Sequence, residues 1–265
     1  MIEPETFLLH EAAVGVVQMT LNRPDQLNSM TPQMFAELEA VAYELRDRTD
    51  LRALIITGAG RAFCAGFDLG DAEELAGLSP MGMLGLQDKA ARSLAALRAL
   101  PVPVIAAVNG AAAGGGFALT LAADIRLASP AARFNAAFVR IGLSAGDLGT
   151  SWHLPRLIGS GRAAEIAFTG RFVEAEEAER IGLVNRIVPA ETLIDEALAL
   201  TAQIATHSSG GVQLSKRALQ SNLDIPFSAA LELENRGQAL LTRGEDMPEA
   251  LQAFKEGRAP VFTGR

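Results

Sequence analysis

Two glycine-rich turns are the places where this chain could do chemistry. Residues 61–69 read Arg-Ala-Phe-Cys-Ala-Gly-Phe-Asp-Leu, and residues 109–117 read Asn-Gly-Ala-Ala-Ala-Gly-Gly-Gly-Phe. Glycine lets a backbone approach a ligand closely, and the free N–H groups at the start of a helix attract negative charge. Two such N–H groups that converge on one oxygen would form an oxyanion hole, which stabilises the charge that develops on a reacting carbonyl group.

Each glycine-rich turn also has explanations that involve no reaction or a different ligand. A run of glycines before a helix permits close packing of that helix against its neighbours. A nucleotide site is disfavoured, because no Gly-Lys-Ser or Gly-Lys-Thr follows and the spaced glycines and acidic partner of a dinucleotide site are missing. Asp68, in the first turn, is expected to hold the geometry of the turn rather than to transfer protons.

The stretches around these turns predict an α/β fold. Residues 14–21, 51–57, 103–108 and 124–128 are apolar or alternating and rich in β-branched side chains, which is typical of strands. The Thr-Pro pair at residues 31–32 is typical of a helix start. Repeated strands that are linked by helices indicate a parallel sheet with helices packed outside it.

The second half of the chain is predicted to be mostly helical. We therefore divide the chain into a core of residues 1–200, which would carry the site, and a C-terminal helical region of residues 201–265. Apolar faces in this second region need a cover, which partner subunits would supply. A Gly- and Pro-rich stretch at 70–85 is expected to be a mobile loop or lid. The predicted helices are 163–168, 174–181, 191–206, 208–220, 227–241 and 248–256, with one strand-like stretch at 183–188.

The composition disfavours several classes of function. With 23 basic and 31 acidic side chains the net charge is −8, so no general basic field attracts nucleic acid or anionic lipid. Cys64 is the only cysteine, which excludes an intramolecular disulfide and a cysteine-rich zinc site, and it is expected to be a small buried side chain. No metal site is expected, since His153 has no partner at metal-binding spacing. Without a secretory signal or an apolar run that could span a membrane, cytoplasmic residence is expected.

The combination of motifs is similar to that of a known family. Ala-Phe-Cys-Ala-Gly-Phe-Asp-Leu at 62–69 is followed by Pro-Val-Ile-Ala-Ala-Val-Asn-Gly at 103–110 and Ala-Gly-Gly-Gly at 113–116. This order closely resembles the crotonase superfamily, also called the enoyl-CoA hydratase/isomerase family, and the likeness covers nearly the whole chain. The resemblance implies a crotonase-like spiral of ββα repeats with a C-terminal helical trimerisation region, in which trimers commonly pair into hexamers.

The resemblance also implies an acyl-coenzyme A thioester as substrate and a set of site residues. The N–H groups of Phe67 and Gly115 would form the oxyanion hole that polarises the thioester carbonyl. Coenzyme A would be part of the substrate, so no separate cofactor is expected. Solvated surface charge or helix packing is the alternative explanation for Arg23, Phe254, Lys255 and Arg258. The expected coenzyme A contacts are Arg23, Ala62, Ala65, Asp68, Leu69, Phe254, and Lys255 or Arg258.

The chain departs from the family pattern at two positions that matter for the reaction. The two glutamates that hydratases of the family use correspond here to Ala118 and Phe138, so isomerisation of a double bond is favoured over hydration. Asp147, in a stretch that looks like the dienoyl-CoA isomerases after a one-residue insertion, is the candidate proton carrier. In an apolar pocket beside Phe138 and Trp152 its pKa should rise. Its alternative role is that of a helix N-cap.

Two other functions stay open at this point. Another enolate reaction on an acyl-CoA, such as hydrolysis or carbon–carbon cleavage, could use the same oxyanion hole and Asp147. A CoA-ester binding protein that has lost catalysis is the other alternative, because neither Ala118 nor Phe138 can ionise.

Overall fold

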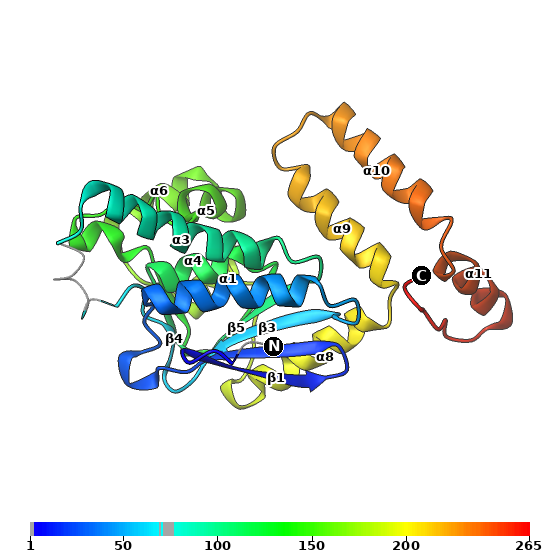
Figure 1. Cartoon of the computed structure of the whole chain (residues 1–265), viewed down its shortest axis with the longest axis horizontal. Helices are drawn as coiled ribbons and strands as arrows, with labels where there is room; N and C mark the ends of the chain where they lie inside the picture. Colours follow the sequence, from blue (N-terminus) through cyan, green and yellow to red (C-terminus); the bar gives the residue numbers. More distant parts are fainter. Residues whose placement is uncertain (1–2, 69, 71–76) are drawn as a thin grey trace.

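A parallel sheet forms the centre of the computed structural model, which describes residues 3–68, 70 and 77–265 (Figure 1). This larger sheet has the strand order β1-β2-β3-β5-β7-β10. β1 and β2 are antiparallel, whereas the neighbours from β2 to β10 run parallel, as predicted. β1 was not predicted. The strands are β1 (Phe7–Ala13), β2 (Val16–Leu21), β3 (Ala53–Gly58), β5 (Val104–Val108), β7 (Ile125–Ala128) and β10 (Arg186–Ile187).

A second, smaller sheet has the order β4-β6-β8-β9 and gives the fold its repeat. Its strands β4, β6 and β8 each follow a strand of the larger sheet, and they pair with one another in parallel. The chain therefore repeats a strand, a second strand and a helix, advancing one place in both sheets each time, which is the predicted ββα spiral. The strands of this sheet are β4 (Ala62–Cys64), β6 (Ala111–Ala113), β8 (Arg133–Asn135) and β9 (Val173–Glu174).

Helices α1 (Pro32–Arg46), α3 (Pro80–Arg98) and α4 (Gly115–Ala122) cover the sheet, and α1 and α3 lie side by side (Figure 1). The predicted start of α1 is confirmed, because Thr31 Oγ1 accepts a hydrogen bond from the Met34 N–H at 3.1 Å. The apolar side chains that α1 and α3 turn inward are buried, and every residue of α4 is buried. The second glycine-rich turn is thus tied to a fully buried helix.

The predicted loop at 70–85 is wrong for its second half. α3 begins at Pro80, and Ser79 Oγ accepts a hydrogen bond from the Gly82 N–H at 3.1 Å. Serine followed by proline is a strong helix start, which the glycines at 82 and 85 concealed. The first half of the predicted lid, residues 71–76, lies outside the described residues.

All six helices predicted for the second half are found, and the predicted strand at 183–188 contains β10. α5 was not predicted as a helix, because Pro155 stands inside it and proline disfavours a helix interior. Within the described ranges, no helix is both long and apolar enough to cross a membrane. The remaining elements are η1 (Pro24–Gln26), η3 (Ala137–Ile141), α5 (Thr150–Ile158), α6 (Ser160–Thr169), α7 (Ala175–Arg180), η4 (Ala190–Thr192), α8 (Leu193–Ala205), α9 (Ser209–Ser221), α10 (Phe227–Leu241) and α11 (Asp246–Glu256).

Helices α9, α10 and α11 form an arm, residues 209–265, that projects from the core (Figure 1). The boundary predicted after residue 200 lies inside α8, just before this arm begins. Lys216 on α9 anchors the arm, because its Nζ lies 2.7 Å from Asp124 Oδ2 and donates to the Val102 carbonyl at 2.8 Å. Large apolar side chains of the arm, such as Phe227 and Leu240, are exposed in the single chain.

Candidate active site

The first glycine-rich turn is held in place by the backbone of Met30. The Met30 N–H donates to the Gly66 carbonyl at 2.7 Å, and the Asp68 N–H donates to the Met30 carbonyl at 2.8 Å. Met30 therefore pairs with Phe67 as in a parallel ladder. In such a ladder the residue between the two bonded neighbours, here Phe67, points its own N–H away from Met30. Among the described residues, the Phe67 N–H has no hydrogen-bond acceptor.

The two turns meet through their backbones. Gly66 has a φ of +98°, and a Cβ built on it would lie 2.8 Å from the Ala113 carbonyl oxygen and 3.4 Å from the Gly115 nitrogen. Only glycine permits such an approach. The Gly115 N–H stands at the start of α4, where no helical carbonyl precedes it, and it too lacks an acceptor within the described part of the chain. The residues predicted to donate the oxyanion-hole hydrogen bonds are thus brought close together.

Asp68 acts as an anchor of the first turn. Its carboxylate accepts hydrogen bonds from Arg23 Nη2 at 2.8 Å, from Ser29 Oγ at 2.9 Å and from the Gly70 N–H at 3.0 Å. Burial works to raise the pKa of Asp68, but these three donors outweigh it and hold the pKa below the usual range. Asp68 therefore stays charged and structural. Arg23 is committed to the same cluster, since its Nη1 also donates to the Ser29 carbonyl at 2.5 Å.

Two residues with left-handed backbones brace the first turn from the side of η1, and the sequence did not reveal their role. Asn28, fully buried with a φ of 57°, donates from Nδ2 to the carbonyls of Ala59 and Ala62, each at 2.9 Å. Leu27, with a φ of 52°, accepts the Ala65 N–H at 3.0 Å.

The expected coenzyme A contacts are not all near one another in a single chain. Ala62 is buried in β4 and Ala65 is exposed just after it, whereas Leu69 lies outside the described residues. Phe254 and Lys255 lie on α11, which Figure 1 shows at the opposite end of the molecule from β4. One copy of the chain therefore does not bring the residues of α11 to its own first turn.

Asp147 lies half-buried on loop 143–149, between η3 and α5. Burial raises its pKa above the usual range, against a hydrogen bond from the Leu148 backbone that lowers it, and the direction is the predicted one. The alternative role as a helix N-cap is not observed, because Gly149 occupies the N-cap of α5 and no side chain caps the helix. A carboxyl group with a raised pKa suits proton transfer near neutrality.

Apolar side chains line the paired turns where hydratases of the family have glutamates. Ala118 is fully buried, and Phe138 is 5% exposed. Phe138 Cε1 lies 3.8 Å from the position of a Cβ built on Gly114, and Leu148 Cδ1 lies 3.3 Å from that of a Cβ built on Gly115. Loop 143–149 thus contacts the second turn through Leu148.

The aromatic neighbours on α5 are engaged elsewhere. The Trp152 ring lies close to two guanidinium groups, with Arg98 Cζ at 5.1 Å and Arg156 Cζ at 4.1 Å from its centroid. Burial, helped by Arg98, Arg126 and Arg156, lowers the pKa of His153 to about 4. His153 is therefore neutral near pH 7. No cluster of metal-binding side chains is found in the described segments.

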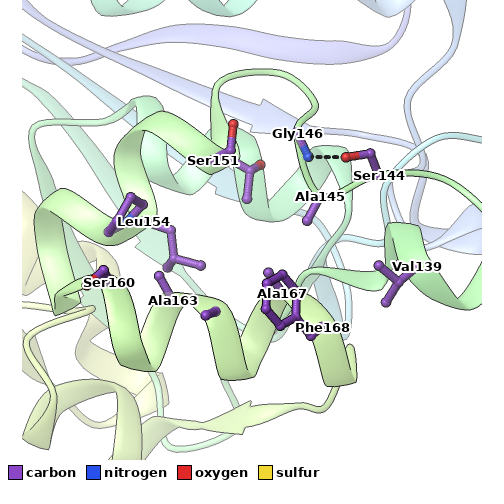
Figure 2. Close-up of a pocket in the computed structure, with 13 residues that line it drawn as sticks. Val139, Ser144, Ala145, Gly146, Ser151, Leu154, Ser160, Ala163, Ala167 and Phe168 are labelled. Carbon is purple, nitrogen blue, oxygen red and sulfur yellow. Dashed lines mark hydrogen bonds between the residues drawn. The ribbon is translucent and has the colours of Figure 1, made fainter.

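A pocket of about 460 Å³ opens beside loop 143–149, and no motif in the sequence indicated it. Figure 2 shows that α5 and α6 form its walls and that the segment from Ser144 to Gly146, closed by a hydrogen bond between these two residues, forms its rim. Its lining is mostly apolar, with a few hydroxyl groups and no charged side chain. Such a pocket suits a neutral, largely apolar group.

Comparisons with known proteins identify the family of this chain. The family model described as enoyl-CoA hydratase/isomerase matches residues 11–265. A Mycobacterium tuberculosis protein named "Probable enoyl-CoA hydratase EchA12" is 46% identical over 260 residues, which cover 94% of this chain and 89% of that one. The 1,2-epoxyphenylacetyl-CoA isomerase of Escherichia coli is 39% identical over 263 residues, which cover 98% and 99%.

A solved structure shares the whole architecture. The enoyl-CoA hydratase of Bacillus anthracis superimposes with a TM-score of 0.93 at 35% identity, covering 98% of this chain and 100% of that one. The ββα spiral, the pair of facing turns and the match along residues 11–265 lead to one conclusion. This chain is an enzyme of the enoyl-CoA hydratase/isomerase family and has the crotonase fold.

Proposed function

We propose that this enzyme moves a carbon–carbon double bond in an enoyl-CoA and does not hydrate it. One observation carries the proposal: Asp147, a half-buried carboxylate, stands on the loop that contacts the second of the two facing turns through Leu148. A hydratase of the usual type needs two carboxylates to hold and activate water, and Ala118 and Phe138 provide none.

The proposed reaction needs one base and the oxyanion hole. The N–H groups of Phe67 and Gly115 stabilise the negative charge on the thioester oxygen. The Asp147 carboxylate removes a proton from C2 of a 3-enoyl-CoA, and the electron pair of that C–H bond moves into a dienolate. The dienolate then takes the proton back at C4, which yields the 2-enoyl-CoA and regenerates the carboxylate.

The named relatives support the acyl-CoA ester as substrate, and one of them supports isomerisation. The Escherichia coli relative is named as an isomerase of a CoA ester, whereas the Mycobacterium tuberculosis relative is named for hydration. Hydrolysis or carbon–carbon cleavage of an acyl-CoA would use the same oxyanion hole. Binding of a CoA ester without turnover is the third candidate.

An absorbance assay of thioester conjugation tests the proposal. With 3-enoyl- and 3,5-dienoyl-CoA we expect a change in conjugation, and with crotonyl-CoA we expect no loss of the 2,3 double bond. Asp147→Asn should lower kcat by a factor on the order of 10²–10⁴, the usual contribution of a general base. Full turnover by this variant, or efficient hydration of crotonyl-CoA by the wild type, would contradict the proposal; calorimetric binding without any turnover would favour the third candidate.

We propose further that coenzyme A lies bent along the first turn, near Ala62, Ala65, Asp68 and Leu69, and that α11 of a second copy completes its site. Lys255 is a better phosphate ligand than Arg258. Arg258 is held by both carboxylate oxygens of Glu249, at 2.5 and 2.9 Å, whereas Lys255 has no partner among the described residues. Arg23 would donate to a phosphate from the guanidinium N–H groups that its own hydrogen bonds leave free.

A homotrimer or a pair of trimers would supply that second copy. The exposed apolar side chains of the arm require a cover, and a like chain provides one. Light scattering should therefore give three or six times the 27.9 kDa of one chain. Cytoplasmic residence stays a prediction, which a single unpaired cysteine suits.

A further inference from the structure

Apolar side chains occupy the space beside the facing turns, and the nearest belongs to Met30, whose Sδ lies 2.9 Å from a Cβ built on Gly115. Leu148 Cδ1 reaches to 3.3 Å from a Cβ built on Gly115, and Phe138 Cε1 reaches to 3.8 Å from a Cβ built on Gly114. We call Leu148 and Phe138 the apolar screen. Because Gly115 carries one of the two proposed oxyanion-hole N–H groups, the screen stands next to the place where the thioester oxygen would lie.

The backbone of Leu148 shows that its side chain is held there by the surrounding structure. Leu148 has a φ of 48°, which is unfavourable for a residue with a branched side chain, and Gly149 follows it with a φ of 80°. Leu148 also packs against the main hydrophobic core. Such backbone conformations persist where tertiary contacts impose them, and they gather at functional sites.

The other two left-handed residues that are not glycine support the same view. In the described part of the chain only Leu27, Asn28 and Leu148 have positive φ without being glycine. Leu27 and Asn28 brace the first turn, and Leu148 contacts the second. Within the described residues, backbone strain of this kind therefore occurs only where the chain supports the paired turns or contacts them.

We propose that Leu148 and Phe138 determine the outcome of the reaction by keeping water away from the dienolate and from the carboxyl group of Asp147. This inference rests on the proposed isomerase function and deepens it. Asp147 is half-buried and is the immediate chain neighbour of Leu148, so the base and one member of the apolar screen lie on the same loop. The proton that Asp147 takes from C2 is then returned to C4 of the same substrate molecule before it can exchange with solvent.

The step balances without any further reactant. One C–H bond breaks at C2 and one forms at C4, the electron pair passes through the dienolate, and the carboxylate is restored. Water is neither consumed nor needed. In a site open to solvent, the protonated carboxyl group would exchange its proton with water between the two transfers, and the new C–H bond would carry a solvent hydrogen.

Turnover in deuterium oxide tests the inference. A 3-enoyl-CoA is converted by the wild-type enzyme, and mass spectrometry of the product at early times measures the fraction with deuterium at C4. We expect a minority of labelled product from the wild type. Leu148→Ala opens the screen while keeping a side chain that is equally strained at this φ, and it should raise the labelled fraction roughly threefold or more, because solvent then reaches the site.

Matched variants separate the screen from general effects on the loop. Leu143→Ala makes the same change at an exposed side chain of the same loop, and its labelled fraction should equal that of the wild type. Phe138→Leu keeps the screen apolar and should give less label than Phe138→Gln, whose side chain is similar in size to leucine but polar. Leu148→Gly, which relieves the backbone strain, should give as much label as Leu148→Ala and shows that the effect does not come from misfolding.

The outcomes distinguish the two proposals. If the wild type isomerises its substrate but labels it as fully as Leu148→Ala does, the inference fails while the proposed function stands. If the enzyme isomerises no enoyl-CoA, the proposed function fails and the inference falls with it.

Discussion

At the scale of single residues, Asp147 links activity to stability. Burial raises the pKa of Asp147 in the folded protein, so the folded state favours the neutral acid. Its contribution to stability is present at low pH and is lost as the pH rises through the raised pKa. Asp147→Asn removes this loss, and we expect a higher melting temperature than that of the wild type at pH 7.

The pH dependence and a control check this expectation. Thermal unfolding should show the two melting temperatures converging as the pH falls towards about 4, the ordinary range of an aspartate. Asp88→Asn, at an exposed position of α3, should leave the melting temperature unchanged at either pH. A wild type that is more stable than Asp147→Asn at pH 7 would mean that the carboxylate has a stabilising partner.

Part of the site could be predicted from residue types. The rest depends on backbone conformations that the sequence does not indicate. The glycine-rich turns indicated an oxyanion hole, but Phe67, Gly115 and Asp147 were assigned through the family resemblance. The positive φ of Leu27 and Leu148 could not be predicted, because leucine does not favour a left-handed backbone and only tertiary contacts impose it.

At the scale of elements, the approach of the two turns depends on Gly66. A Cβ at this residue would lie 2.8 Å from the Ala113 carbonyl oxygen, so Gly66→Ala must push the turns apart. We expect kcat to fall by a factor on the order of 10², as when one oxyanion-hole donor is lost. Steady-state kinetics with the substrate of the wild type measures this.

Gly182→Ala is the matched control for strain. Gly182 has a φ of +80°, but the nearest atom to its built Cβ is 4.0 Å away. The variant should lose about 1–2 kcal/mol of unfolding free energy from the left-handed backbone and keep its kcat. An equal loss of kcat in both variants would show that strain, and not the contact between turns, limits the activity.

Most of the longer elements were predictable, with α3 as the exception, and the shortest strands were not. Continuous apolar runs identified β3 and β5, and apolar periodicity identified helices of the second half. β4 and β6 have three residues each, and β9 has two, so no alternation can be seen in them. The second sheet, which holds the first turn in place, followed only from the family resemblance.

At the scale of the whole molecule, Lys216 fastens the arm to the core. Its Nζ lies 2.7 Å from Asp124 Oδ2, and its side chain is 7% exposed. Lys216→Met would leave the Asp124 carboxylate without its cation, and we expect a loss of about 3 kcal/mol in unfolding free energy, measured by urea denaturation. Combining it with Asp124→Asn should recover part of the loss, and no recovery would show that the ion pair is not the cause.

The second-copy arrangement predicts an effect of α11 on substrate binding. If Lys255 of one chain meets the coenzyme A of another, Lys255→Met should raise KM and leave kcat nearly unchanged, because the contact is the same in ground and transition states. Arg258→Met should change KM less, since Arg258 is held by Glu249. Equal KM values for Lys255→Met and the wild type would show that Lys255 of α11 does not contact coenzyme A.

The partly buried ring of Trp152 gives this enzyme a built-in optical probe. It is the only tryptophan of the chain, and Arg156, which stacks on it, is paired at 3.1 Å with Asp224 in the connection between α9 and α10. Movement of the arm would shift Arg156 and change the charge above the indole. Tryptophan emission from the unlabelled protein should therefore report the docking of the arm, independently of any assay of turnover.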